Sequence, residues 1–166
     1  TKRVWRLNTR GDYWVLDLSN KKLQKIGGDA PEATLMFAKF SPDATSVAYV
    51  QNRDIYIQDL SDLKVTQLTK SDAPTKINGT FHWAYEEEFS IRDGFRFSAD
   101  GKRIAFWEID GSGIELFPLV DNTSTLYPKI QYIPYPKVGT TNPAARIGVI
   151  ELASLATTWM AIPGDV

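Results

Sequence analysis

Three adjacent carboxylates, Glu86, Glu87 and Glu88, stand between aromatic residues in the segment 83–89. Like charges repel one another, and the aromatic flanks indicate that this segment is held against packed structure. Fixed negative charge of this kind suits the binding of a cation, such as a metal ion, a guanidinium or a protonated amine. Taken alone, such a run is more often the solvated face of a helix, so the rest of the chain has to decide between these interpretations.

Composition excludes several other functions. The chain has 166 residues, a hydrophobic content of 43% and a net charge of −1, so it can bury a core but offers no basic stripe for nucleic acid. No apolar run approaches the ~18 residues that a membrane span requires. Cysteine is absent and His82 is the single histidine, so neither a disulfide framework nor a zinc site is predicted.

Two kinds of glycine-containing motif give no cofactor site. The segment 110–113, Asp-Gly-Ser-Gly, lacks the lysine and the strand-to-helix context of a phosphate-binding loop. The Asp-Gly pairs that begin at Asp93 and Asp100 could bind calcium, but such pairs chiefly form hairpin turns. We therefore predict no cofactor and no metal.

Internal repetition predicts a β-sheet protein built from similar units. The segment 12–19 aligns with 54–61 at an offset of 42 residues (54 minus 12), and a Phe-Ser-x-Asp turn followed by an apolar strand occurs at 40–50 and again at 97–107. A period near 42 with several short strands is the size of one β-propeller blade. We predict an all-β fold, a partial β-propeller of about three four-stranded antiparallel blades, with a short helical insertion that carries the Glu run.

The repeats also divide the chain, which we interpret as a fragment of a single propeller domain. Blade parts are expected at about residues 1–27, 33–70 and 77–156, with insertions at about 77–94 and 111–145 that enlarge the third unit. The length alone would allow a closed four-bladed propeller, but the insertions take up the residues that a fourth blade would need. The first residues read as the middle of a strand, so we expect a longer protein, and open strand edges predict self-association of the fragment.

A set of motifs occurs in a recognisable order along nearly the whole chain. They are Trp5-Arg6, Tyr13, Asp17-Leu18, the Phe-Ser-Pro-Asp turn from Phe40, Asn52-x-Asp54-Ile-Tyr56, Trp83-x-Tyr85-Glu86-Glu87-Glu88, Tyr127-Pro128-Lys129 and the Pro-Tyr-Pro-Lys segment that runs from Pro134 to Asn142-Pro143. This set resembles the N-terminal β-propeller of dipeptidyl peptidase IV-type enzymes, within the prolyl oligopeptidase clan of serine peptidases. The Glu run and the Pro-Tyr-Pro-Lys segment are the specific parts, because Ser-Pro-Asp turns are generic to propellers.

The resemblance implies an eight-bladed propeller that caps a separate α/β-hydrolase domain with a Ser-Asp-His triad. The chain has no Gly-x-Ser-x-Gly elbow, so we expect it to contain no catalytic residues and to hydrolyse nothing alone. Glu87 and Glu88 match the glutamates that bind the free N-terminal ammonium of a peptide substrate. Arg6 matches the arginine that contacts a substrate backbone carbonyl, with Trp5 packed near it.

Three further residues around the Glu run, His82, Trp83 and Tyr85, are expected to support the site. Tyr85 is expected to pack in the core and His82 to be structural. The family usually has Asp at the position of His82, where it could cap the helix, and His fills that role poorly. Without the family context, Arg6 would be read as a sheet-surface residue stacked on an aromatic ring.

Two functions stay open. The first is the substrate-recognition part of a dipeptidyl peptidase IV-like serine exopeptidase. Its partners would be the peptide N-terminus, the hydrolase domain of the same parent chain and, as often in the family, a second copy. The resemblance implies a bacterial periplasmic or secreted protein. The second function is a non-catalytic propeller scaffold for protein–protein interaction. A Gly-x-Ser-x-Gly elbow beyond Val166 would favour the enzyme.

Overall fold

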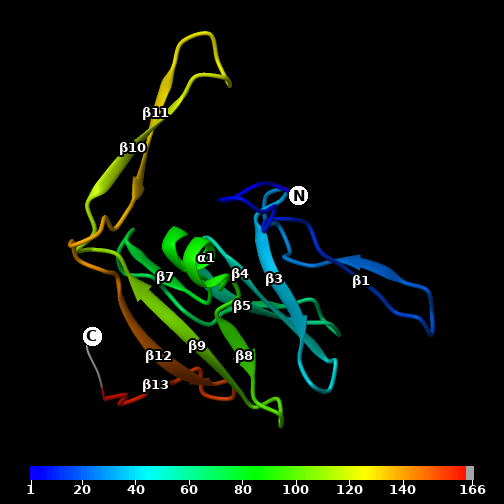
Figure 1. The fold of residues 1–166 in the computed structure, drawn as a ribbon. Helices are drawn as coiled ribbons and strands as arrows, with labels where there is room; N and C mark the ends of the chain where they lie inside the picture. Colours follow the sequence, from blue (N-terminus) through cyan, green and yellow to red (C-terminus); the bar gives the residue numbers. More distant parts are fainter. Residues whose placement is uncertain (164–166) are drawn as a thin grey trace.

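The computed structural model describes residues 1–163 as an all-β protein with one short helix (Figure 1). In this range the strands form four antiparallel sheets: the hairpins β1–β2 and β10–β11, a four-stranded sheet in the order β3-β4-β5-β6, and a five-stranded sheet organised around β9. The elements are β1 (Trp14–Leu16), β2 (Leu23–Lys25), β3 (Leu35–Phe40), β4 (Ser46–Gln51), β5 (Asp54–Asp59), β6 (Val65–Gln67), β7 (Lys76–Asn78), α1 (Trp83–Phe89), β8 (Phe95–Phe97), β9 (Arg103–Asp110), β10 (Leu116–Asp121), β11 (Lys129–Pro134), β12 (Ala144–Glu151) and β13 (Thr157–Trp159).

The repeated sequence units form the same turns at corresponding places. The Ser41 hydroxyl donates to the Asp43 carboxylate at 2.7 Å before β4, and the Ser98 hydroxyl donates to Asp100 at 2.6 Å before β9. A turn closed by an Asp-x-Ser hydrogen bond likewise follows both β1 and β5. Within each turn, these short side chains form hydrogen bonds in place of the bonds that a neighbouring strand would supply. The internal repeat read from the sequence therefore corresponds to a repeated local structure.

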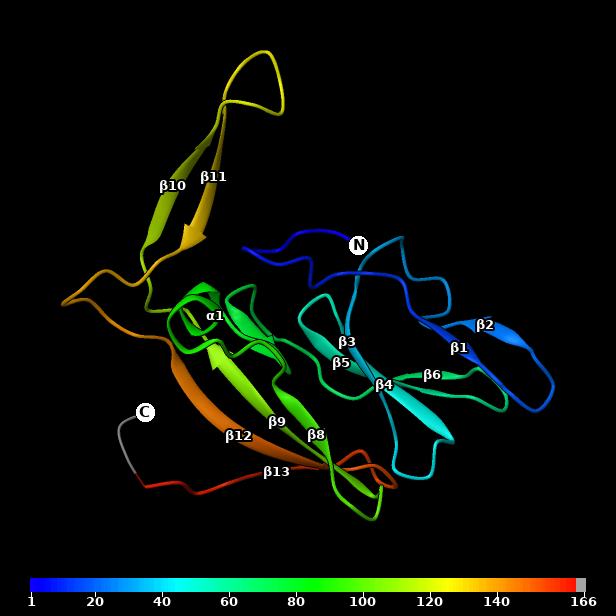
Figure 2. The ribbon, with the colours of Figure 1, turned by 45° about the vertical axis from the view of Figure 1, so that its right-hand side comes forward.

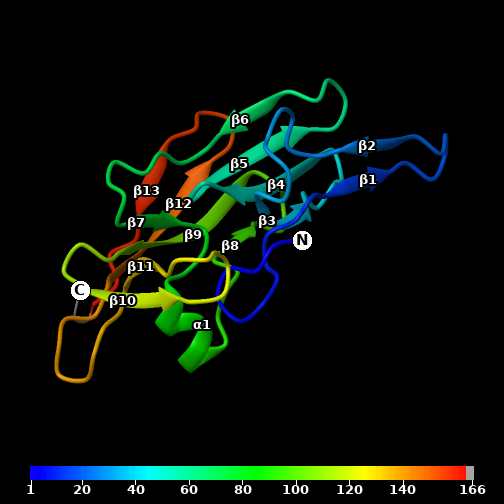
Figure 3. The ribbon, with the colours of Figure 1, turned by 90° about the horizontal axis from the view of Figure 1, so that it is seen from above.

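The two larger sheets pack against each other through a shared core. Met36, Val50 and Ile55 of the four-stranded sheet belong to one buried cluster with Phe95 and Ile104 of the five-stranded sheet. Each buried side chain of this size contributes ~1.5–3 kcal/mol relative to exposure. Figure 3 shows the two sheets side by side, so this cluster fixes their mutual position.

Strand β9 positions the insertion that carries the helix. Its residues 108–110 pair with β7, whereas residues 104–106 pair with β8. The chain therefore leaves the sheet after β7, forms α1 and returns as β8. Gly79 and Gly94 close the base of this excursion: the Gly94 N–H donates to the Gly79 carbonyl at 2.9 Å, and a Cβ on Gly94 would lie 2.9 Å from the Gly79 carbonyl carbon.

The β10–β11 hairpin, called the arm below, projects away from the two larger sheets (Figures 1 and 2). Its strands pair in register from Leu116 with Pro134 to Asp121 with Lys129. Tyr135, directly after β11, packs against Trp83 of α1 with ring centroids 4.6 Å apart. The base of the arm therefore lies beside the helix with the Glu run.

These elements confirm the predicted all-β fold and the short helix on the Glu run. The interpretation of the first residues as part of a strand is wrong: residues 4–7 form a bend in which the Val4 N–H donates to the Leu7 carbonyl at 3.1 Å, and Lys2 and Arg10 make only an isolated bridge. The arm is a feature that the sequence reasoning did not foresee. The division of the chain into propeller blades, and their number, stays a prediction.

Candidate functional site

Helix α1 carries the three glutamates and has well-defined ends. His82 occupies the N-cap position in an extended conformation, but its side chain makes no capping hydrogen bond. The helix ends at Ser90, which adopts a left-handed conformation with φ of 56° and bonds through its backbone N–H to the Tyr85 carbonyl. Glu86 lies in the first turn, where the helix dipole favours negative charge. The missing side-chain cap agrees with the poor capping expected of His82.

The three glutamates divide between two cavities; successive residues on a helix point about 100° apart, so adjacent side chains need not face the same side. Glu86 lines a smaller cavity of about 230 Å³. Glu87 and Glu88 line a larger cavity of about 1090 Å³. The side chain of Glu87 is only 6% exposed, whereas Glu88 is exposed. Glu86 therefore lines a different cavity from the other two.

Three segments far apart in sequence meet at the larger cavity. One part of its lining comes from the N-terminal bend, one from α1 and one from the base of the arm with the chain that follows it; Figure 1 shows these segments. Five of the seven residues singled out from the sequence contribute to the lining: Trp5, Arg6, Trp83, Glu87 and Glu88. The fold therefore brings most of the predicted set to one place.

Arg6 and Glu87 form an ion pair inside this cavity, with Arg6 Nε 2.5 Å from Glu87 Oε2. The Arg6 side chain is 76% exposed, so solvent screens the attraction, and the pair contributes little to stability. Its main consequence is to orient the carboxylate. The second oxygen, Glu87 Oε1, is buried and has no hydrogen-bond partner within residues 1–163. A buried acceptor without a donor is unfavourable, so this atom is suited to receive an N–H group from a ligand.

Tyr85 and His82 lie outside the larger cavity. Tyr85 packs between Phe81 and Phe89, with ring centroids 5.2 Å and 6.1 Å away. His82 is buried beside the smaller cavity, where its Nε2 lies 3.3 Å from the Thr75 carbonyl oxygen. Burial lowers the pKa of the His82 imidazole below its ordinary value. Both side chains support the helix from behind and do not reach the glutamate cavity.

The arm and the chain directly after it add residues that the sequence reasoning did not assign to the site. Phe117, Tyr135 and Lys137 line the larger cavity together with the glutamates. A signal for the arm was present in the sequence, since residues 116–121 and 129–134 are two apolar-rich stretches separated by a segment that begins Asn-Thr-Ser-Thr. That pattern is typical of a hairpin. Treating this region only as a Pro-rich insertion concealed its contribution to the site.

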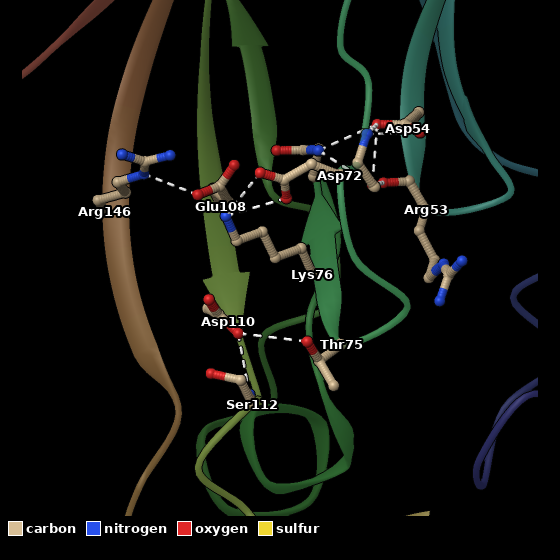
Figure 4. Close-up of polar contacts among 11 residues, drawn as sticks. Arg53, Asp54, Asp72, Thr75, Lys76, Glu108, Asp110, Ser112 and Arg146 are labelled. Atoms are coloured by element: carbon tan, nitrogen blue, oxygen red, sulfur yellow. Dashed lines mark hydrogen bonds and ion pairs between the residues drawn. The ribbon is translucent and has the colours of Figure 1, made fainter.

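Carboxylates on the two larger sheets are already satisfied (Figure 4). Asp54 accepts hydrogen bonds from neighbouring hydroxyl and amide groups, and Glu108 pairs with Arg146 at 2.7 Å. Among the carboxylates of residues 1–163, only Glu86 and Glu87 have a buried oxygen without a partner. In the same range no group of three or more His, Cys, Asp or Glu side chains could hold a metal ion. The unsatisfied negative charge is therefore concentrated on α1.

Within residues 1–163, the chain forms no helix that is both long and apolar enough to span a bilayer.

The family comparison covers the whole chain. A family model described as the dipeptidyl peptidase IV (DPP IV) N-terminal region matches residues 1–166. A protein of Fusarium vanettenii named "Probable dipeptidyl-aminopeptidase B" is 30% identical over 176 residues, which cover 98% of this chain and 19% of that protein. Its namesake from Talaromyces stipitatus is 30% identical over 162 residues, which cover 90% of this chain and 18% of that protein. The chain thus spans about a fifth of the length of these curated relatives.

A solved structure shares the fold. The crystal structure of dipeptidyl peptidase 4 from Porphyromonas gingivalis matches with a TM-score of 0.85 and 25% sequence identity, over 99% of this chain and 23% of that chain. The arrangement of antiparallel sheets described above therefore resembles the N-terminal propeller of that enzyme.

Proposed function

This chain belongs to the dipeptidyl peptidase IV N-terminal region family, and from that premise we propose that it is the substrate-recognition portion of a propeller in a serine-type dipeptidyl aminopeptidase. One observation carries the proposal: Glu87 and Glu88 line the same cavity, and one buried oxygen of Glu87 has no partner in the described residues. The ligand that we assign to this cavity is the protonated N-terminus of a peptide.

Charge and hydrogen bonding support this ligand. A free α-amine has a pKa of about 7.7–8.0, so it is mostly protonated at neutral pH and offers several N–H donors. Carboxylates form charge-assisted hydrogen bonds with such a group, which are stronger than neutral ones. A peptide nitrogen inside a chain carries neither the charge nor the extra protons, and it would leave the buried Glu87 carboxylate unsatisfied. The pair of glutamates therefore selects chain ends.

Fixing the amine also fixes the position of cleavage. An extended chain advances at most ~3.3–3.6 Å per residue, so a nucleophile about 7 Å beyond the amine would cut after the second residue. The guanidinium of Arg6 contacts Glu87 through Nε, and a guanidinium has further N–H donors that can bond a substrate carbonyl. We therefore assign Arg6 two tasks, orienting Glu87 and holding the peptide extended.

Catalysis requires a partner domain. Because the chain spans about a fifth of its relatives, we assign the nucleophile to an α/β-hydrolase domain of the same parent protein and expect no hydrolysis by this fragment alone. A periplasmic or secreted location belongs to the same proposal.

A homodimer is a further part of the proposal. Val120, Ile130 and Tyr132 of the arm are 57%, 58% and 60% exposed, and a second copy would cover them. In this chain by itself, the edges of β6 and β13, which are unpaired within residues 1–163, would add self-association.

A non-catalytic scaffold is the alternative function, and the same exposed apolar side chains of the arm favour it. The parent sequence separates the two functions. A Gly-x-Ser-x-Gly elbow followed by Asp and then His supports the peptidase, whereas a parent without the nucleophile supports the scaffold.

Substitution on one helix tests the amine site. The full-length protein is assayed with a chromogenic Gly-Pro amide as the wild type and as Glu87→Gln, Glu88→Gln and Glu86→Gln. The first two variants should lose about a hundredfold in kcat/KM, since each removes a carboxylate from the ammonium, and losing one partner of a charge pair that the bound peptide desolvates costs ~2–5 kcal/mol. Glu86→Gln is the matched control, because it removes the same charge from the same helix but faces the smaller cavity. Equal activity of all three variants would contradict the proposal.

A further inference from the structure

The arm has two unlike faces. Side chains alternate along a strand, so Phe117 and Leu119 of β10 lie on the same face as their cross-strand partners Ile133 and Gln131 of β11. All four line the larger cavity and are called the inner face of the arm. The alternate positions are absent from that lining and form the outer face: Pro118, Val120, Ile130 and Tyr132. The arm thus turns one face toward the glutamate cavity.

Aromatic rings continue the inner face onto helix α1. The ring centroid of Tyr135 lies 5.4 Å from that of Phe117 and 4.6 Å from that of Trp83. The Lys137 ammonium lies 5.2 Å from the Phe117 ring centroid. Phe117, Tyr135 and Trp83 therefore form a continuous row from arm to helix, which is called the aromatic wall. All three line the larger cavity.

The aromatic wall adjoins the proposed amine site. Trp83 precedes Glu87 by four residues on α1, and residues four apart lie on the same side of a helix, one turn from each other. In a bound peptide, the amine and the first side chain leave the same Cα atom. A peptide whose amine is held by Glu87 would therefore place its first side chain within reach of the aromatic wall. The cavity volume of about 1090 Å³ leaves room for a side chain beside the amine.

We propose that the aromatic wall and the inner face of the arm bind the side chain of the peptide's first residue and favour a large apolar or aromatic residue there. This specificity rests on the proposed function, because the amine at Glu87 is its fixed point. Large side chains would bury apolar surface and contact the rings, whereas glycine makes neither contact. The glutamates accept any free amine, so the arm is the part that discriminates between first residues.

Kinetic discrimination between two substrates tests this inference. The full-length protein is assayed with chromogenic Phe-Pro and Gly-Pro amides, and the ratio of their kcat/KM values is compared between variants. Phe117→Ala and Tyr135→Ala should each lower the Phe-Pro to Gly-Pro ratio about tenfold. Tyr132→Ala, on the outer face of the same hairpin, should leave the ratio unchanged. A general loosening of α1 would lower kcat/KM for both substrates together and would not change their ratio.

Binding of the dipeptides Phe-Pro and Gly-Pro, measured by calorimetry on the same variants, gives a readout that needs no catalysis. The wild type should bind Phe-Pro more tightly, and Phe117→Ala should remove that preference. Unchanged ratios in both inner-face variants, an equal fall in Tyr132→Ala, or no binding of either dipeptide would overturn the inference. The two proposals fail in different ways. The N-acetylated dipeptides are measured alongside: binding that survives acetylation contradicts the glutamate site, whereas binding that acetylation abolishes but that shows no preference for Phe contradicts only the aromatic wall.

Discussion

Arg6 Nε lies 2.5 Å from Glu87 Oε2, and this ion pair joins the N-terminal bend to helix α1. The glutamate side chain is 6% exposed and the arginine side chain is 76% exposed, so the buried carboxylate is held by a cation that reaches into it from the surface. The remaining glutamate oxygen is free of protein partners within residues 1–163. The ion pair orients the Glu87 carboxylate but leaves its Oε1 without a hydrogen-bond donor, and a ligand amine could supply that donor.

Removal of the orienting cation should weaken substrate binding more than folding. In the full-length protein, Arg6→Ala should raise KM for a Gly-Pro amide about tenfold or more, because the Glu87 carboxylate loses its fixed direction. The thermal midpoint should change little, since an ion pair with so exposed a partner is largely screened. Lys2→Ala is the control, because it removes a charge from the same segment without contacting Glu87. Equal KM values for the two variants would argue against an orienting role.

A better helix cap should tighten the site. His82→Asp would place a carboxylate acceptor at an N-cap that has no side-chain hydrogen bond, and such a cap is worth ~1 kcal/mol. The KM of the full-length protein for dipeptide-releasing substrates should fall. His82→Ala removes the buried ring without adding a cap, so the difference between the two variants isolates capping. Identical kinetics for both would show that capping at this position has no effect on the site.

The repeated turns should make the fold sensitive to acid. The Ser41 hydroxyl holds the pKa of the Asp43 carboxyl below its ordinary value, and the Ser98 hydroxyl does the same for Asp100. A carboxyl with a lowered folded-state pKa contributes stability that is fully present above its unfolded pKa of about 3.9. This stability is lost as the pH falls through the lower folded-state pKa. The thermal midpoint should therefore decline only below about pH 4 on account of these turns. The decline should be smaller in Asp43→Asn, and a midpoint with the same acid dependence in that variant would contradict this account.

The outer face of the arm should mediate self-association. Tyr132 is 60% exposed on a projecting hairpin, and Tyr132→Glu would place a charge in any contact that covers it. Light scattering of the full-length protein should show a dimer for the wild type and a shift toward monomer for Tyr132→Glu. Gln131→Glu on the inner face is the matched control and should stay dimeric. A wild type that is monomeric at high concentration would show that this prediction is wrong.

Local sequence patterns predicted the strands and the helix better than the contacts between them. The repeat that relates Asp12 to Asp54 indicated a β-sheet protein, and the Glu run between aromatic residues indicated a helix; both are present. Turn chemistry and strand composition act over a few residues, so they are readable from sequence. The interpretation of residues 4–7 as a strand was wrong, because their apolar and aromatic side chains make other contacts: Val4 packs against the shared core and Trp5 lines the larger cavity.

The site could be predicted only as a set of residues. Arg6 and Glu87 are distant in sequence, and no local pattern relates them, so their contact depends on how the N-terminal bend packs on the insertion. The family resemblance brought both to attention, but it did not indicate that they contact each other. Tyr135 was noted as part of a motif, and its packing on Trp83 depends on the arm returning to the helix. Long-range packing of this kind is a property of the tertiary structure, not of a motif.

Blocking the amine tests the central claim most directly. The full-length protein is given Gly-Pro amide substrates with a free and with an acetylated N-terminus, as the wild type and as Glu87→Gln. Acetylation removes the charge and two donors, so the wild type should lose about a hundredfold or more in kcat/KM, and Glu87→Gln should discriminate far less. Equal turnover of the free and acetylated substrates by the wild type would contradict recognition of the peptide N-terminus by Glu87 and Glu88.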